Sequence, residues 1–157
     1  MKRWKAITQK LRLLGRQEAG VQLAEVAIAL PVLLVLFAAV AEFGRFFYTD
    51  LTLGKATRAG ARYLTTKQLT VDEINKAKSL VICGDPLVAS VCDNPTVTGL
   101  TPEMVNITPT SGIPNSVTVE IVGYQFEPFF DIGALAHQDL SLRLNITPAT
   151  TMKYLLN

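Results

Sequence analysis

The stretch of sequence that decides the fold runs from residue 26 to residue 41 and reads VAIALPVLLVLFAAVA. All sixteen residues are apolar, and Glu25 and Glu42 bracket the run. As a helix it would cover about 24 Å, which is short of the roughly 30 Å hydrocarbon core of a bilayer, so flanking apolar residues must complete a span. The run is apolar on every side, unlike a helix at the surface of a soluble protein. We therefore expect a transmembrane segment over about residues 23–44.

Charge is distributed unevenly on the two sides of this run. The net charge of the 157-residue chain is only +2, but residues 1–20 carry six basic side chains and one acidic side chain, whereas residues 21–157 carry nine basic and twelve acidic ones. The positive-inside rule then places the N-terminus in the cytoplasm and the rest of the chain outside. Binding to nucleic acid is not expected, because the acidic body offers no cluster of Lys and Arg for phosphate groups.

Three interpretations of residues 1–42 fit this pattern. A basic head, an apolar run and the small residues at 39–41 match a secretory signal peptide, which would release a soluble domain after Ala41. An uncleaved single-pass anchor that carries an interaction domain is the second interpretation, and an anchor that is cut before the apolar run is the third. Residues 42–66 contain no Pro and remain compatible with a helix, which favours a helix that continues out of the membrane over a discarded signal peptide.

Glu25 favours the third interpretation. A carboxylate at the edge of a hydrocarbon segment is costly, so it is a candidate functional group that needs a partner. Together with Gly20 and the basic leader, it resembles the processing motif of prepilins, in which a prepilin peptidase at the cytoplasmic face cuts after the Gly. The resemblance implies cleavage between Gly20 and Val21, and pairing of Glu25 with the new α-amino group of Val21 on a neighbouring subunit. Because an unpaired carboxylate at that depth is expensive, such pairing would reward the correct stagger between subunits.

The resemblance extends further along the chain, over EVAIALPVLL at residues 25–34, EFGR at residues 42–45 and the segment 56–63. These segments resemble the TadE-like family, the pseudopilin-like components of tight-adherence (Flp-type) pilus machinery in bacteria. The resemblance implies a single-pass protein of the bacterial inner membrane with an extracytoplasmic, periplasmic domain. Its partners would be the prepilin peptidase, other pilin or pseudopilin subunits, the inner-membrane assembly platform and the lipid bilayer. Major Flp pilins are little more than the helix, so this longer chain is expected to be a minor structural subunit.

The outer domain is expected in residues 67–157. Periodicity of three to four predicts a short helix over residues 72–82. Alternation of apolar and polar residues predicts strands at 117–121 and 140–146, with a weaker strand at 104–108. The aromatic segment 124–130 is interpreted as a loop whose Phe side chains pack on the helix or on a partner.

The expected fold is therefore α+β. It comprises a cytoplasmic leader over residues 1–20, a long helix over residues 21–66, and a small antiparallel sheet within residues 67–157. About 90 residues make a thin core by themselves, so the sheet is expected to cover the helix face that runs from Phe43 to Leu64.

The two cysteines, Cys83 and Cys92, flank a Gly-Asp-Pro turn. Outside the membrane a disulfide is favoured over free thiols. A zinc site would need four ligands, and the chain has one histidine, His137. No nucleophile elbow, Gly-rich phosphate loop or calcium-loop spacing accompanies it. We expect neither catalysis, nor a bound metal, nor a cofactor.

Overall fold

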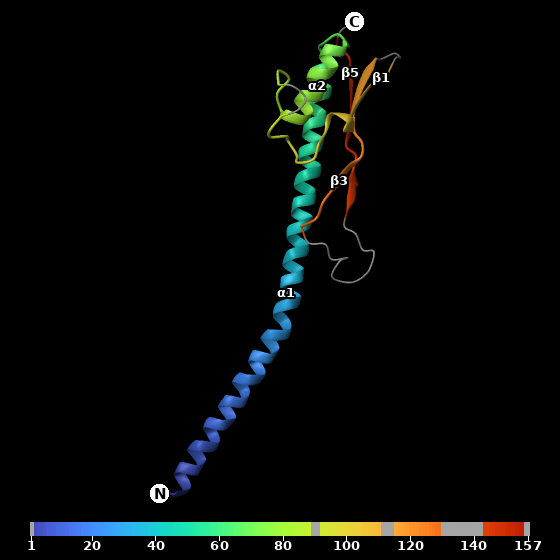
Figure 1. The fold of residues 1–157 in the computed structure, drawn as a ribbon. Coiled ribbons are helices and arrows are strands. Elements are labelled where there is room, and N and C mark those ends of the chain that lie inside the picture. Colours follow the sequence, from blue (N-terminus) through green and yellow to red (C-terminus); the bar gives the residue numbers. More distant parts are fainter. Residues whose placement is uncertain (1, 89–91, 111–114, 130–142, 156–157) are drawn as a thin grey trace. The chain divides into compact units, whose positions relative to one another are not determined.

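The computed structural model describes the backbone of residues 2–88, 92–110, 115–129 and 143–155, and the side chains from residue 20 onward. Contacts divide the chain into two compact units, Met1–Ala41 and Glu42–Asn157. Helix α1 (Lys2–Leu64) enters both units (Figure 1). In its described residues, the second unit also contains a second helix, a short 3-10 turn and five strands.

Helix α1 has 63 residues and contains Pro31. Its stretch from Gly20 to Leu64 includes a window that is long and apolar enough to cross a membrane, and none of that window is buried inside the protein. A proline is tolerated in such a helix because neighbouring groups in a membrane helix can satisfy the freed carbonyl. The predicted α+β fold with a long apolar N-terminal helix is confirmed, and the helix already begins at Lys2, within the basic leader.

The strands of the second unit form two small antiparallel sheets. The larger sheet has the order β1-β2-β5, and the smaller sheet pairs β3 with β4. The strands are β1 (Val105–Thr110), β2 (Ser116–Ile121), β3 (Tyr124–Phe126), β4 (Leu144–Ile146) and β5 (Ala149–Lys153). The 3-10 turn Pro102–Met104 leads into β1. Threonines are in register across the outer face of the larger sheet, at Thr108, Thr118 and Thr151.

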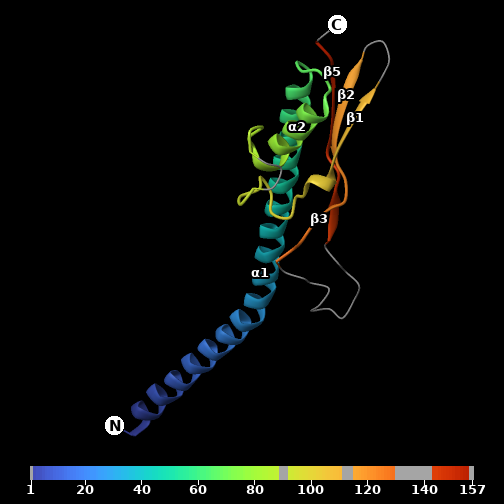
Figure 2. The ribbon, with the colours of Figure 1, turned by 45° about the horizontal axis from the view of Figure 1, so that its top comes forward.

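The core of this unit lies between the larger sheet and the two helices, α1 and α2 (Val71–Cys83), which lie beside the sheet in both views (Figures 1 and 2). Strand β2 places every second side chain in it, because successive side chains of a strand point to opposite faces. The fully buried members include Val117, Val119 and Ile121 of β2, Leu53, Ala61 and Leu64 of α1, and Ala77 and Val81 of α2. Thr57 is also buried, and its hydroxyl lies 3.0 Å from that of Thr150 in β5.

Helix α2 is delimited by its caps. The Thr70 hydroxyl accepts the backbone N–H of Glu73, and Gly84 ends the helix with a positive φ of 76° that favours glycine. The Glu73 carboxylate in turn accepts the hydroxyl of Tyr63 on α1, at 2.7 Å, and the ammonium of Lys76, at 3.0 Å. The hydrogen bond from the Tyr63 hydroxyl, which has the larger effect, and the one from the Lys76 ammonium hold the pKa of Glu73 below its ordinary value.

Gly60 lets the two helices approach closely. A Cβ built at this position would lie 2.6 Å from Cγ2 of Val81 on α2, far inside ordinary contact. The same Cβ would meet Val119 of β2 at 3.7 Å. A residue without a side chain is therefore required where α1, α2 and the sheet meet.

Three details of the predicted outer domain are wrong. The predicted helix face from Phe43 to Leu64 is covered only in part: Ala61 and Leu64 are buried, whereas Phe43, Phe47 and Leu51 are exposed. Phe46 and Leu53 pack on the core in their place. Exposed and buried apolar residues look alike in a sequence, so periodicity could not show where the covered face begins. Leu144 is exposed although Ile146, two residues later, is buried.

The third difference concerns the strands. The segment predicted to be an aromatic loop contains strand β3, and β5 was not predicted, because its sequence Ala-Thr-Thr-Met-Lys has no run of alternating apolar residues. The predicted helix at 72–82 and the strands at 104–108 and 117–121 correspond to α2, β1 and β2. Residues 140–142 of the predicted closing strand, Phe130 and His137 lie outside the described residues.

Candidate functional site

The predicted processing segment lies within α1. Gly20, Val21 and Glu25 are all exposed, and a Cβ at Gly20 would meet no other atom within 4 Å. Among the side chains described from residue 20 onward, none forms a hydrogen bond or an ion pair with Glu25. Residues four apart lie on one face of a helix, so Val21 and Glu25 are neighbours one turn apart. Among the described side chains, none covers the predicted cleavage position or pairs with the Glu25 carboxylate.

A second carboxylate follows the apolar run and has a different environment. Glu42, the first residue of the second unit, is only 6% exposed. Its Oε2 lies 3.1 Å from Nη1 of Arg45, one turn further along α1, and its Oε1 accepts the backbone N–H of Phe129 at 2.8 Å. Phe129 follows strand β3, so Glu42 joins two segments that are 87 residues apart in the sequence. A buried carboxylate with a charged partner and a backbone donor is satisfied rather than available for chemistry.

Aromatic rings complete the surroundings of this ion pair. The guanidinium carbon of Arg45 lies 3.6 Å from the centroid of the Phe129 ring and 5.4 Å from that of Phe126, both within the range of cation–π attraction. Phe126 is buried and meets Phe46 of α1 edge to face, with 5.6 Å between ring centroids. We call Glu42, Arg45, Phe46, Phe126 and Phe129 the Glu42 cluster.

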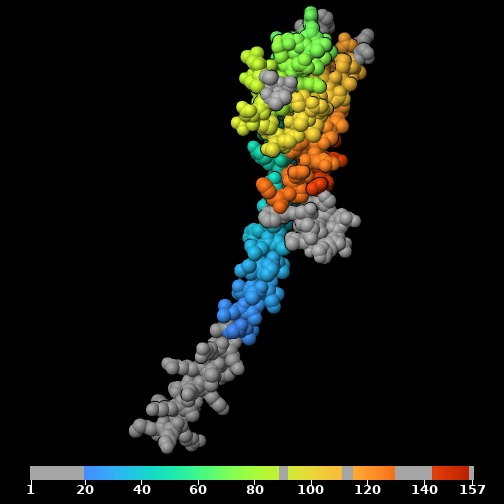
Figure 3. All heavy atoms as spheres, in the orientation of Figure 1, coloured from blue at the N-terminus to red at the C-terminus, as the bar shows by residue number. Residues whose placement is uncertain are grey.

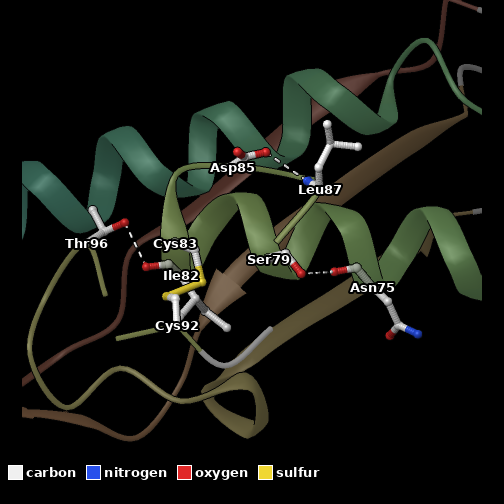
Figure 4. Close-up of a disulfide and its surroundings, with 8 residues drawn as sticks. All are labelled: Asn75, Ser79, Ile82, Cys83, Asp85, Leu87, Cys92 and Thr96. Atoms are coloured by element: carbon white, nitrogen blue, oxygen red, sulfur yellow. Dashed lines mark hydrogen bonds between the residues drawn. A yellow bond between two sulfur atoms is a disulfide. The ribbon is translucent and has the colours of Figure 1, made fainter. Parts of the chain in front are cut away.

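The two cysteines form the predicted disulfide (Figure 4). Cys83 is the last residue of α2, and its Cα lies 6.0 Å from that of Cys92. Hydrogen bonds hold both ends of the connecting loop. Asp85 accepts the backbone N–H of Leu87 at 2.8 Å, and the hydroxyl of Thr96 donates to the carbonyl of Ile82 at 2.9 Å. The disulfide therefore holds the chain where it leaves α2. It is not part of the Glu42 cluster.

The comparison with protein families identifies the segment that contains both carboxylates. Residues 20–62 match the TadE-like protein family. The match begins at Gly20, includes Glu25, Glu42 and Arg45, and ends within α1 before Leu64. It confirms the resemblance seen in the sequence for this segment of the chain. The comparisons with curated proteins and with solved structures found no match.

From the sequence, Glu25 was predicted to act in processing and assembly, whereas Glu42 was noted only as part of the EFGR segment that resembles the family. Glu42 accepts the backbone N–H of Phe129, 87 residues away in the sequence, and no local sequence signal indicates such a contact. The spacing Glu-x-x-Arg at residues 42–45 was the available hint, because residues three apart on a helix can pair. Within the described part of the chain, no group of three or more His, Cys, Asp or Glu side chains could hold a metal ion.

Proposed function

We propose that the protein is a minor, pseudopilin-like structural subunit of a tight-adherence (Flp-type) pilus assembly or secretion system, cut after Gly20 by a prepilin peptidase. The observation that supports this most is the start of the TadE-like match at Gly20, which leaves the basic residues 1–19 outside it. An exposed Glu25 follows at the position where a pilin-like subunit needs a carboxylate. The apolar run comes directly after that carboxylate.

Cleavage requires the helix to open around Gly20. A peptidase binds an extended backbone, whereas Gly20 and Val21 lie within α1. Glycine in a helix interior costs about 1 kcal/mol relative to alanine, so this position is a natural place for the helix to unwind. Without a Cβ, the backbone can also approach enzyme groups closely. In this scheme the leader holds the N-terminus in the cytoplasm and is then removed.

After cleavage, Glu25 would act in assembly. The mature chain would start at Val21, and its α-amino group would be the partner for Glu25 of a neighbouring subunit. Pairing of the Val21 α-amino group with Glu25 of a neighbouring subunit would shift the two parallel helices by about one turn relative to each other. Any other shift would leave a carboxylate unpaired near the hydrocarbon. The chain would then serve as a structural, non-enzymatic component. It would cross the bacterial inner membrane once, with the domain Glu42–Asn157 on the periplasmic side.

Substitutions at Glu25 and Gly20 test the two steps separately. We expect Glu25→Ala to remain in the membrane but to be lost from purified pilus or assembly fractions, with Gln22→Ala, an exposed polar residue of the same turn, as the matched control. Gly20→Ala should accumulate the precursor, because it favours the helix and crowds the cleavage position. Normal incorporation of Glu25→Ala would refute the assembly role, and normal processing of Gly20→Ala would place the cut elsewhere.

A further inference from the structure

Large apolar side chains remain exposed beyond the end of the apolar run, on the second unit. Phe43, Phe47, Tyr48 and Leu51 form a stripe at helical spacing on α1, and each is at least 58% exposed. Phe129, after strand β3, is 77% exposed although its backbone N–H is bonded to Glu42. In Figure 3 the segment of β3 lies against α1 within this unit. Exposed aromatic rings from two distant segments therefore lie at the same level of the helix.

The length of the apolar run places this level at the edge of the bilayer. Residues 26–41 cover about 24 Å, and the following turn, Glu42 to Arg45, extends the helix to about 30 Å, the thickness of the hydrocarbon core. Helical side chains lean toward the N-terminus, so the ring of Phe47 covers the turn that contains Phe43. Tyr48, with its polar hydroxyl, comes where aromatic belts of membrane proteins lie.

The Glu42 cluster explains how a carboxylate can lie in that last turn. A free carboxylate at the hydrocarbon edge would be costly. Glu42 instead bonds Arg45 and the Phe129 N–H, and the Phe129 ring lies over the guanidinium of Arg45 at 3.6 Å. The Arg45 side chain is still 39% exposed. The ring of Phe129 therefore presents an apolar surface with a cation beside it.

We propose that the outer domain rests directly on the bilayer, with the ring of Phe129 inserted in the lipid interface beside Phe43 and Phe47, and with Arg45 next to lipid phosphates. The inference rests on the single-span placement of the proposed function. Lipid is the occupant because the exposed apolar residues of α1 in this patch follow the apolar run directly in the sequence, and because the cation of the patch is complementary to anionic headgroups.

Depth-dependent fluorescence quenching tests this placement on the full chain. The only tryptophan is Trp4 in the leader, so Trp4→Phe gives a background without tryptophan emission. Single tryptophans are then introduced at Phe129, at Phe37 within the span, and at Leu87, an apolar loop residue that is 86% exposed. Each variant is reconstituted at high lipid excess in phosphatidylcholine–phosphatidylglycerol vesicles, with or without bromine on the upper acyl carbons. An unchanged thermal unfolding midpoint shows that each variant is folded.

We expect Phe129→Trp to have blue-shifted emission, to lose intensity in brominated vesicles as Phe37→Trp does, and to resist aqueous acrylamide. Leu87→Trp should show the opposite on all three measures. If Phe129→Trp behaves like Leu87→Trp while Phe37→Trp is quenched, the span is correct and the proposed lipid contact is wrong. Protection of Phe129→Trp from acrylamide without quenching by brominated lipid would mean that a second subunit covers it, which also overturns the proposal. An unquenched Phe37→Trp would refute the span itself.

Discussion

Replacing Gly60 with alanine should destabilise the outer domain, although alanine is the better helix former. The added Cβ would lie 2.6 Å from Cγ2 of Val81, so the neighbouring groups must separate by about 1 Å to reach ordinary contact. Val81 is fully buried and branched at Cβ, which leaves it little freedom to rotate away. Overpacking of this kind costs about 1–3 kcal/mol, and the gain in helix propensity recovers only about 0.5–1 kcal/mol.

Gly54 provides the matched control on the same helix, because a Cβ there meets nothing within 4 Å. Gly54→Ala should be stabilised by about 0.5–1 kcal/mol from propensity alone. The propensity gain is common to both variants, so their difference isolates the contact with Val81 and should be about 1–3 kcal/mol. For a domain of this size, that difference corresponds to about 4–12 °C in Tm.

Thermal unfolding of the full chain in detergent, followed by near-ultraviolet circular dichroism with the disulfide intact, measures this difference. Val81→Ala should cost less stability in the Gly60→Ala background than in the parent, since it removes the clashing methyl group. Equal midpoints for Gly60→Ala and Gly54→Ala would refute the close approach of α1 and α2 at Gly60. If the free-energy costs of Gly60→Ala and Val81→Ala simply add in the double variant, the two residues do not interact, and the loss of stability in Gly60→Ala has another cause.

Substitutions at three further places test the contacts of the outer domain by the same unfolding measurement. Replacing Cys83 and Cys92 with serine should cost about 2–3 kcal/mol by freeing the loop, and reductant should lower the stability of the parent but not of this variant. Glu73→Gln should weaken the loss of stability at acidic pH. The folded protein holds the pKa of Glu73 below its ordinary value of 4.5, so this carboxylate contributes stability that is fully present above pH 4.5. That stability is lost as the pH falls through the lower pKa of the folded state. Glu42→Ala should cost about 1–3 kcal/mol by leaving the Phe129 N–H and the Arg45 charge without their acceptor, and Glu42→Gln should cost less. An unchanged midpoint for Glu42→Ala would contradict the Glu42 cluster.

The long helix and the disulfide could be predicted because their signals are local. Sixteen consecutive apolar residues, together with their apolar flanks, indicate a helix that can span a membrane. Cys83 and Cys92 are the chain's only cysteines, so a single intramolecular pairing was available to them. The α2 helix was also predictable, because Thr70 and Glu73 mark its start and Gly84 marks its end.

The contacts across the outer domain could not be predicted, because they join distant segments. Strand β5 is held by its register with β2, from Glu120 opposite Ala149 to Ser116 opposite Lys153, and not by an apolar pattern of its own. Buried Glu42 is bonded to the backbone N–H of Phe129, 87 residues further along the chain. The covered face of α1 was predicted only in part, at Ala61 and Leu64, because buried and exposed residues such as Leu53 and Leu51 are chemically the same.

The mature N-terminus of the protein, determined by mass spectrometry after extraction from bacterial membranes, tests the proposed function most directly. Cleavage after Gly20 predicts a chain that starts at Val21 and retains the whole apolar run. A chain that starts at Met1 would establish an uncleaved anchor, and one that starts at Glu42 would establish a secreted domain. Either of these two results would contradict a processed pilin-like subunit.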